Sequence, residues 1–563
     1  MLDWEDMGYA LNLGTLDPVG IGAALGELAA DALRRPDELT RSWLELSTGQ
    51  MRAGLRVLSG YLGEPAATEP AADRRFADRA WRENPLLRGI LESYELWAEW
   101  ARTLAERSQL TGAQRRKAQF GVGLLIDALA PSNMPWLNPA VIKEAIDTGG
   151  LSVMKGMANM WTDVATNNGR PRQVDASGFE LGRNLAATPG RVIYRNELME
   201  LIAYEPQTDQ VYAEPIVCSP PWINKYYVMD LAPGRSFIEY AVRNEFQVFA
   251  ISYRNPDASV AGLSMDDYLE KGLLTALDVA SRVSGSPRVN VVGLCLGGTL
   301  TAIALGYLAA TGQPERVGWA AVTNTLVDFG EPGDLGVFTD EASIQRLEKE
   351  MAERGYLEAS QMAGTFDWLR GNDLVWNYVV SNWYMGKQPP AFDILAWNAD
   401  STNMPATMHS QYLRACYLRN ELVQPGAFKA LGVPLDLGIV STPMYVLAAE
   451  NDHIAPWRSA YRTTQLVGGD VTFTLTSAGH IAGMVNPVDN PKSSHWARAG
   501  CPPSPEEWRT GAEQCRGSWW AHWLAWASAR SGEKVAPPAL PMGEPAPGQY
   551  VRNRLAPPMD ASR

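Results

Sequence analysis

The sequence is poor in cysteine, with five in 563 residues, and no two of them form a Cys-x-x-Cys pair. Because their number is odd and their spacing irregular, we expect neither a zinc site nor a disulfide framework. Reduced thiols in a cytoplasmic protein are therefore the expectation. Histidine is equally scarce, at five residues, so a histidine at a position that catalysis requires is informative.

Positive charge is also in deficit, and the formal net charge is −14. Nucleic acids and anionic membranes are both polyanionic, so neither is an expected partner. No uncharged apolar run is long enough to span a bilayer, which predicts that the chain has no transmembrane segment. The first 20 residues lack the basic cluster and apolar run of a secretory signal.

Strand–helix alternation is missing from residues 1–185, where apolar residues recur at three- and four-residue spacing and predict a mainly helical N-terminal domain. Over residues 186–563, short β runs alternate with helical segments, which predicts an α/β domain with a mostly parallel sheet between helices. Residues from about 330 to 430 interrupt this alternation with aromatic-rich helices, and we expect them to form an inserted cap. The Pro-rich tail from about residue 535 is expected to be irregular.

The strongest chemical signal is the segment Gly-Leu-Cys-Leu-Gly-Gly at 293–298, between a predicted strand and a predicted helix. It is the nucleophile-elbow pattern Gly-x-Ser-x-Gly with Cys295 in place of serine. The tight turn requires neighbours without side chains, and the helix N-terminus favours a thiolate and a developing oxyanion. The pattern predicts Cys295 as the nucleophile and the Leu296 N–H as one oxyanion-hole donor. The alternative is a glycine-rich turn around a structural cysteine.

An elbow needs an acid and a base, which follow the nucleophile in that order at strand ends in the α/β-hydrolase fold. Asp452 follows an apolar strand, and His480 follows the next strand. We therefore predict Asp452 as the orienting acid and His480 as the general base. Glu450 and His453 remain the competing acid and base.

A second oxyanion-hole donor is expected in the loop 219–227, which follows an early predicted strand. Pro220 and Pro221 have no N–H group, so Trp222 and Ile223 are the candidates. The sequence leaves the choice between them open.

Several segments together resemble the polyhydroxyalkanoate synthases, and the resemblance extends over nearly the whole chain. The most specific are the Gly-x-Cys-x-Gly-Gly box and the segments at 220–227, 254–259, 452–457 and 479–483. Others near the two ends are those at 73–76, 127–131, 182–184, 517–520 and 544–548. One departure is Gln411, which stands where some relatives have tryptophan and leaves the packing of the cap open.

The resemblance implies an acyltransferase of the single-subunit type that polymerises (R)-3-hydroxyacyl-CoA into polyester and releases CoA. It implies a catalytic set of Cys295, His480 and Asp452, no metal and no cofactor, a mobile cap, a homodimer, and a place at the surface of polyester granules. Asp452 either orients His480 or acts on the incoming 3-hydroxyl group. Short acyl groups are the expected substrates, and the bulk of Trp222 is expected to limit acyl size. The rival function is a thioesterase or depolymerase-type hydrolase of the same fold.

Overall fold

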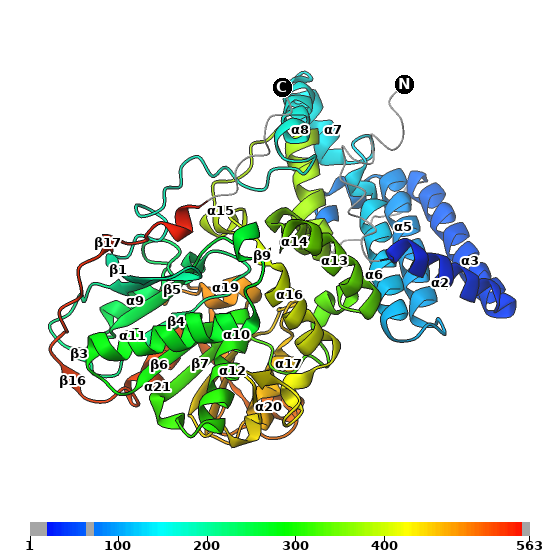
Figure 1. Cartoon of the computed structure of the whole chain (residues 1–563). Helices are drawn as coiled ribbons and strands as arrows, with labels where there is room; N and C mark the ends of the chain where they lie inside the picture. Colours follow the sequence, from blue (N-terminus) through cyan, green and yellow to red (C-terminus); the bar gives the residue numbers. More distant parts are fainter. Residues whose placement is uncertain (1–19, 63–72, 554–563) are drawn as a thin grey trace. The chain divides into compact units, whose positions relative to one another are not determined.

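A computed structural model describes residues 20–62 and 73–553 (Figure 1). The chain divides into two compact units. Unit 1 consists of Met1–Asp175 with Ala363–Pro390, and unit 2 consists of Ala176–Met362 with Ala391–Arg563. The middle of the predicted cap thus groups with the N-terminal helices, which the sequence pattern did not indicate.

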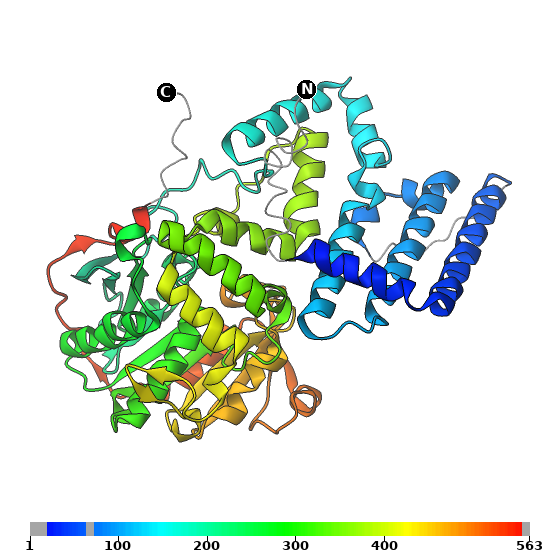
Figure 2. The same ribbon diagram turned by 45° about the vertical axis from the view of Figure 1, so that its right-hand side comes forward.

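The described residues of unit 1 form helices and no strand, which confirms a mainly helical N-terminal region. The longer helices of the first segment are α2 (Ile21–Leu33), α3 (Pro36–Tyr61), α4 (Ala80–Glu83), α5 (Pro85–Glu106), α6 (Gly112–Ala128), α7 (Pro139–Asp147) and α8 (Leu151–Thr166), and the second segment contributes η9 (Asn372–Trp376), η10 (Val379–Tyr384) and most of α14 (Ala359–Leu369). The blue and cyan helices lie side by side in Figure 2. Small and branched side chains of α2, α5 and α6 share one core, which includes Leu28, Ala101 and Val122.

Local signals set where these helices begin. The Asn84 side chain accepts hydrogen bonds from the backbone of Leu86 and Leu87, and Pro85 is the first residue of α5. An asparagine cap followed by proline satisfies the free N–H groups of the first turn and fixes its backbone. Asn138 and Pro139 start α7 in the same way.

Unit 2 is built on one sheet of eleven strands in the order β15-β14-β13-β12-β7-β6-β4-β5-β2-β1-β17. The six central strands, from β13 to β5, are parallel, and the outer ones are antiparallel. The strands are β1 (Gly190–Arg195), β2 (Met199–Tyr204), β4 (Ile216–Ser219), β5 (Val248–Tyr253), β6 (Val289–Leu294), β7 (Val317–Thr323), β12 (Met444–Ala449), β13 (Val471–Thr476), β14 (Ser494–Ala497), β15 (Glu513–Arg516) and β17 (Glu544–Pro545). This confirms the predicted α/β-hydrolase architecture, with antiparallel strands added at both edges.

Helices cover both faces of this sheet (Figure 1). They are α9 (Phe237–Arg243), α10 (Met265–Asp267), η6 (Tyr268–Leu274), α11 (Thr275–Ser284), α12 (Leu296–Ala310), α17 (Trp457–Tyr461), α18 (Thr463–Leu466), α19 (His480–Met484), α20 (Pro505–Gly511) and α21 (Trp519–Ser528). Trp319 of β7 packs against Trp526 of α21 with ring centroids 5.5 Å apart, while its neighbour Ala320 belongs to the main core on the other face. The tryptophans of α21 are therefore packing residues of one sheet face.

The strand order reverses beside β4, because the chain runs from β4 outward to β5 and then returns to β6 on the other side. In parallel α/β sheets, ligands bind outside the carboxyl ends of the strands at such a switch point. The loop at 219–227 follows β4 and Cys295 follows β6. The topology therefore places both predicted oxyanion segments at the favoured edge.

The insertion between β7 and β12 is helical on both sides of the segment that belongs to unit 1. The flanking helices are α13 (Glu341–Arg354), α15 (Asp393–Asn398), α16 (Ala406–Tyr412) and η11 (Leu413–Leu418), while α14 (Ala359–Leu369) begins in unit 2 and continues into the unit 1 segment. The tail differs from its predicted irregular course, because β16 (Lys534–Val535) pairs with β3 (Val211–Tyr212) and β17 pairs with β1. Pro545 is tolerated there because β17 is an edge strand.

Candidate active site

Cys295 lies in a strained turn between β6 and α12. Its backbone has φ 51° and ψ −116°, and a positive φ is one that non-glycine residues seldom adopt. A Cβ atom on Gly297 would lie 1.9 Å from the Ser219 carbonyl oxygen, and one on Gly293 would lie 2.6 Å from the Gly298 Cα. The turn therefore excludes side chains on both sides of Cys295, as the sequence pattern predicted.

His480 and Asp452 are joined by a short hydrogen bond. The Nδ1 atom of His480 lies 2.6 Å from Asp452 Oδ2, and both residues are 7% exposed. The other carboxylate oxygen, Oδ1, accepts hydrogen bonds from the backbone N–H groups of Ile454 at 2.9 Å and Ala455 at 2.8 Å. Both oxygens of Asp452 are thus occupied, and the carboxylate is held by the backbone.

The environment of His480 changes its acidity in opposite directions. Burial lowers the pKa of the imidazole, but the Asp452 carboxylate and the Cys295 thiol outweigh burial and raise the pKa well above its usual value. Charge attraction and hydrogen bonding by these two neighbours are the causes. Since Nδ1 faces Asp452, Nε2 is the ring nitrogen left to face the sulfur. The fold thus brings Cys295, His480 and Asp452 together from three loops.

The competing candidates from the sequence have other partners. Glu450 forms an ion pair with Arg509 at 3.1 Å. His453 is half-buried beside Asp452, and its backbone carbonyl accepts from the Asp334 N–H at 3.2 Å. Among the remaining histidines, Nδ1 of His522 lies 2.9 Å from the Tyr445 hydroxyl, as expected of a structural residue.

The predicted oxyanion-hole donors lie at the same end of the sheet. Leu296 is the first residue of α12, where the helix dipole favours negative charge. Within residues 20–62 and 73–553, no acceptor is found for the backbone N–H groups of Leu296, Trp222 or Ile223. Thr402 holds the 219–227 loop by two hydrogen bonds. Its hydroxyl donates to the Trp222 carbonyl at 2.9 Å, and its backbone N–H donates to the Ile223 carbonyl at 3.4 Å. Both Trp222 and Ile223 stay candidates for the second donor.

Aromatic residues of the insertion lie near the cysteine, and the sequence patterns did not identify them. Burial raises the pKa values of Tyr412 and Tyr417, and the nearby Cys295 adds to both shifts. The Tyr412 ring contacts Trp222 and Tyr417, with centroids 5.6 Å and 5.5 Å away. These rings form an apolar cover beside the sulfur. Gln411 does not disturb it, because its side-chain carbonyl accepts from the Met265 N–H at 2.8 Å.

The other described cysteines differ from Cys295 in their surroundings. Cys218 in β4 and Cys416 in η11 are fully buried, and burial raises the pKa of both thiols well above the ordinary range. A thiol that stays protonated is a poor nucleophile. In the part of the chain that the structure describes, no group of His, Cys, Asp and Glu side chains is arranged to hold a metal ion, and no helix is long and apolar enough to cross a membrane.

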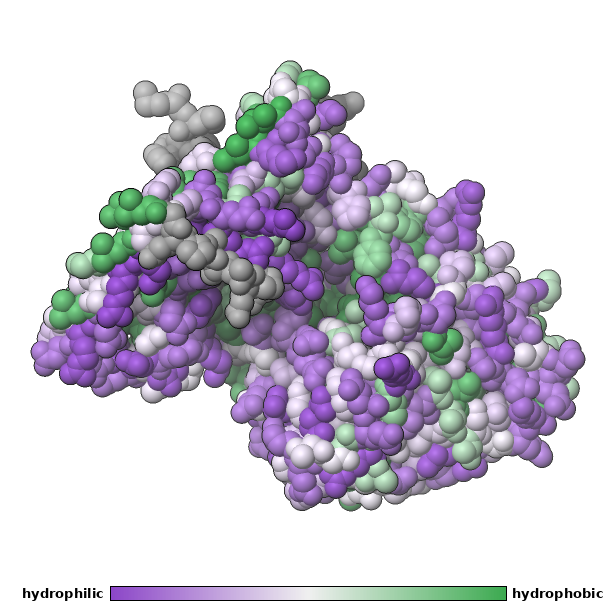
Figure 3. Space-filling model, turned by 180° about the vertical axis from the view of Figure 1, so that it is seen from behind, coloured by the Kyte–Doolittle hydropathy of each residue, from purple (hydrophilic) through white to green (hydrophobic). Residues whose placement is uncertain are grey.

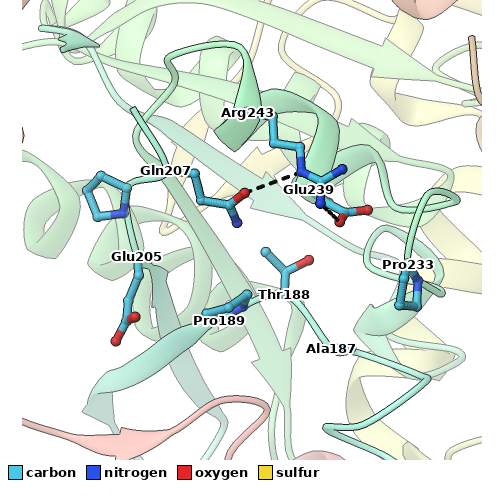
Figure 4. Close-up of a pocket in the computed structure, with 9 residues that line it drawn as sticks. Ala187, Thr188, Pro189, Glu205, Gln207, Pro233, Glu239 and Arg243 are labelled. Carbon is cyan, nitrogen blue, oxygen red and sulfur yellow. Dashed lines mark hydrogen bonds and ion pairs between the residues drawn. The ribbon is translucent and has the colours of Figure 1, made fainter. Parts of the chain in front are cut away.

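A separate hollow of about 310 Å³ lies elsewhere on unit 2 (Figure 4). Its lining includes an ion pair between Arg243 and Glu239 at 2.7 Å, and the Arg243 guanidinium also donates to Gln207 at 3.3 Å. None of the predicted site residues lines it. The candidate active site is therefore the edge of the sheet around Cys295.

These features define a protein of the α/β-hydrolase fold with a cysteine at the nucleophile elbow. A family model described as "alpha/beta hydrolase fold" matches residues 227–487, and one described as "Poly-beta-hydroxybutyrate polymerase (PhaC) N-terminus" matches residues 72–241. The chain is 42% identical to the "Poly(3-hydroxyalkanoate) polymerase subunit PhaC" of Cupriavidus necator, with 87% of this chain and 85% of that protein covered. The chain belongs to the poly(3-hydroxyalkanoate) polymerase family.

Other members of the family align over most of their length. The "Poly(3-hydroxyalkanoate) polymerase" of Methylorubrum extorquens is 40% identical, with 96% of this chain and 94% of that protein covered. The "Poly(3-hydroxyalkanoate) polymerase 2" of Ectopseudomonas oleovorans is also 40% identical, with 94% of each chain covered. Among solved structures, the enol-lactonase from Burkholderia xenovorans LB400 matches 51% of this chain and 91% of its own, at 15% identity and a TM-score of 0.27.

Proposed function

We propose that this protein polymerises (R)-3-hydroxyacyl groups from CoA thioesters into polyester through an acyl-enzyme on Cys295. The observation that carries the mechanism is the position of Cys295 at a helix N-terminus beside His480, whose Nδ1 bonds to Asp452. A buried imidazole with a raised pKa retains a proton taken from a thiol, which leaves the thiolate as the attacking form.

The first step is acyl transfer from CoA to the enzyme. The Cys295 proton moves to His480 Nε2, and the thiolate attacks the thioester carbonyl. The Leu296 N–H, with that of Trp222 or Ile223, donates to the oxyanion. The intermediate collapses with breakage of the bond to CoA sulfur, and the CoA thiolate takes the proton from His480. Exchange of one thioester for another is nearly balanced, which suits cysteine better than serine.

The second step forms the ester bond of the polymer. His480 removes the proton of a 3-hydroxyl group, and its oxygen attacks the carbonyl of an acyl thioester. The sulfur leaves as a thiolate and recovers the proton. We assign Asp452 the orienting role, because its Oδ1 is occupied by two backbone N–H groups and its Oδ2 by His480. Both carboxylate oxygens therefore already have partners within the protein.

A hydrolase of the same fold would pass the acyl group to water. The aromatic cover of Tyr412, Tyr417 and Trp222 supports exclusion of water from the acyl-enzyme. The test is incubation with (R)-3-hydroxybutyryl-CoA while free CoA, free acid and polymer are all measured. We expect CoA and polymer in parallel with little free acid, and Cys295→Ala should release no CoA. Free acid in place of polymer would favour the hydrolase.

We also propose that the protein works as a cytoplasmic homodimer at the surface of the polyester, which α7 and α8 contact. Helix α8 has polar side chains on its buried face and apolar side chains on its exposed face. Ser152, Asn159 and Asp163 are buried, whereas Met154 and Trp161 are 69% and 63% exposed. In Figure 3, green side chains stand at the top of the view, where α7 and α8 lie in Figure 1.

The charges on α7 and α8 favour an uncharged partner over an anionic one. Lys143 and Asp147 pair with each other at 2.7 Å on α7, and the exposed apolar side chains of α7 and α8 continue from Ile146 to Trp161. A polyester is apolar and uncharged, so it fits this face better than an anionic bilayer does. Binding of the full chain to preformed amorphous polyester particles tests this, with Met154→Gln/Trp161→Gln as the variant and Lys155→Gln as the control. Equal binding by the wild type, the double variant and the Lys155→Gln control would contradict the proposed contact. Light scattering measures the mass in solution, and a monomer mass would contradict the homodimer.

A further inference from the structure

The segment that follows β7 holds the elbow and the histidine loop together. Thr323, Asn324 and Thr325 are all at most 2% exposed. Asn324 has φ 47°, a left-handed conformation that asparagine tolerates better than most residues. All three lie outside the nucleophile elbow, the Asp452 loop and the His480 loop, yet each contacts Cys295 or His480.

The two threonines hold the backbone of the nucleophile. The Cys295 N–H donates to the Thr323 carbonyl at 2.9 Å. The Thr325 hydroxyl lies 3.1 Å from the Cys295 carbonyl and 3.0 Å from the Thr323 carbonyl, so it donates to one of them at a time. A Cβ on Gly298 would lie 2.0 Å from the Thr325 Oγ1. Thr325 therefore requires a glycine at position 298, and its hydroxyl contacts the backbone carbonyl of Cys295.

Asn324 reaches the other catalytic loop. Its side-chain N–H group donates to the backbone carbonyl of His480, and its own N–H donates to the Leu447 carbonyl of β12 at 2.8 Å. The orientation of the amide is fixed, because its oxygen in the same place would face the His480 carbonyl. That oxygen, Oδ1, is buried and has no partner among the described residues.

The order of the strands explains why such a bridge is needed. The elbow follows β6 and the histidine loop follows β13, and β7 and β12 lie between them. With neighbouring strands about 4.8 Å apart, the two loops start about 14 Å from each other. Between them, the end of β7 is bonded to the elbow on one side and, through Asn324, to His480 on the other.

We propose that Asn324 is a positioning residue that sets the separation between the Cys295 sulfur and the His480 imidazole. It fixes the first residue of α19 relative to β7, and Thr323 and Thr325 fix Cys295 relative to the same segment. Loss of the Asn324 side chain removes this contact between β7 and the first residue of α19, while the hydrogen bond from His480 to Asp452 persists. A misplacement of about 1 Å between reacting groups costs about 100-fold in rate.

The test substitution is Asn324→Gly, because glycine keeps the left-handed backbone and removes only the amide. We expect kcat to fall about 10- to 100-fold with KM within about two-fold of the wild type. Asn324→Asp keeps the shape but presents an oxygen to the His480 carbonyl, so it should not restore activity. Asn420→Gly is the matched control, since Asn420 also has φ 48° and uses its side chain to bond Asp328 at 2.9 Å.

A second readout separates positioning from stability. The rate of Cys295 alkylation by iodoacetamide is measured against pH, together with the thermal midpoint. In Asn324→Gly the alkylation midpoint should differ from the wild-type value, because His480 is no longer held in place to accept the thiol proton, while in Asn420→Gly it should stay at the wild-type value. An unchanged midpoint in Asn324→Gly, or an equal shift in Asn420→Gly, would overturn the inference.

The inference depends on the proposed roles of Cys295 and His480, but alkylation needs no substrate. If Cys295→Ala still releases CoA, the proposed function fails. If Cys295→Ala is inactive and the Asn324 variants match the wild type in kcat and in alkylation, only the positioning role fails.

Discussion

Substitution of Asp452 by asparagine tests the orientation of the catalytic histidine. Oδ1 of Asp452 accepts two backbone N–H groups, from Ile454 and Ala455. An asparagine oxygen will keep that position, because an amide N–H₂ there would face two donors. The amide nitrogen must then point at His480 Nδ1, which becomes an acceptor and moves the ring proton to Nε2. An imidazole with its proton on Nε2 cannot accept the proton of Cys295.

The size of the effect follows from the two contributions that are lost. The wrong tautomer of a catalytic histidine lowers rates about 10⁴-fold in serine proteases, where an oxyanion hole still operates. Asp452 is also the largest of the influences that raise the pKa of His480, so the imidazole in the variant becomes a weaker base. We expect acylation to fall about 10³- to 10⁴-fold, equivalent to about 4–5.5 kcal/mol, and to remain detectable.

The assay is single-turnover release of CoA from (R)-3-hydroxybutyryl-CoA, followed from pH 6 to about pH 9. The residual rate of Asp452→Asn should rise with pH toward about 8.5, where a cysteine ionises without help. Glu450→Gln is the matched control, because it removes a nearby carboxylate that pairs with Arg509. Acylation by Asp452→Asn at the wild-type rate, or wild-type polymer yield, would refute the orienting role.

Three further predictions concern the elbow, the core and the acyl site. Gly297→Ala should lower kcat at least about 100-fold, because the new Cβ would lie 1.9 Å from the Ser219 carbonyl; kinetics and thermal unfolding measure it, and an active, equally stable variant would contradict the close approach. Burial raises the pKa of Asp230 to about 6, which hydrogen bonds from Thr188 and Ser236 only partly offset. The folded state therefore holds this proton more tightly than the unfolded chain, and the stability that it contributes below pH about 4 is lost as pH rises through about 6, a loss of about 3 kcal/mol. Asp230→Asn should flatten the fall of the thermal midpoint between pH about 4 and about 6. An unchanged slope would argue against a raised pKa of Asp230. Trp222→Ala should shift preference toward longer acyl groups, measured as kcat/KM over a C4 to C12 series of 3-hydroxyacyl-CoA; an unchanged ratio would mean that this ring does not limit acyl size.

The sequence by itself determined the parts of the site that depend on local backbone geometry. Eight consecutive residues, 291–298, encode the end of a strand, a turn with glycines on both sides of Cys295 and the start of the following helix. The positions at which α5 and α7 begin, Pro85 and Pro139, are also set locally, because an asparagine cap acts on N–H groups two and three residues away. The order of Cys295, Asp452 and His480 at strand ends was also readable, since the fold restricts where each can stand.

Only the tertiary structure decided which distant residues meet. Whether Asp452 or Glu450 reaches His480 depends on the direction of each side chain, which the tertiary structure sets. Glu450 pairs with Arg509, which is 59 residues away in the sequence. Tyr412 and Tyr417 come to Cys295 from an insertion, and residues 363–390 of that insertion join the N-terminal helices. Asn324 meets the carbonyl of His480 across 156 residues. Hydrogen bonds of this kind leave no periodic trace in a sequence, because they depend on the order in which strands are placed in the sheet.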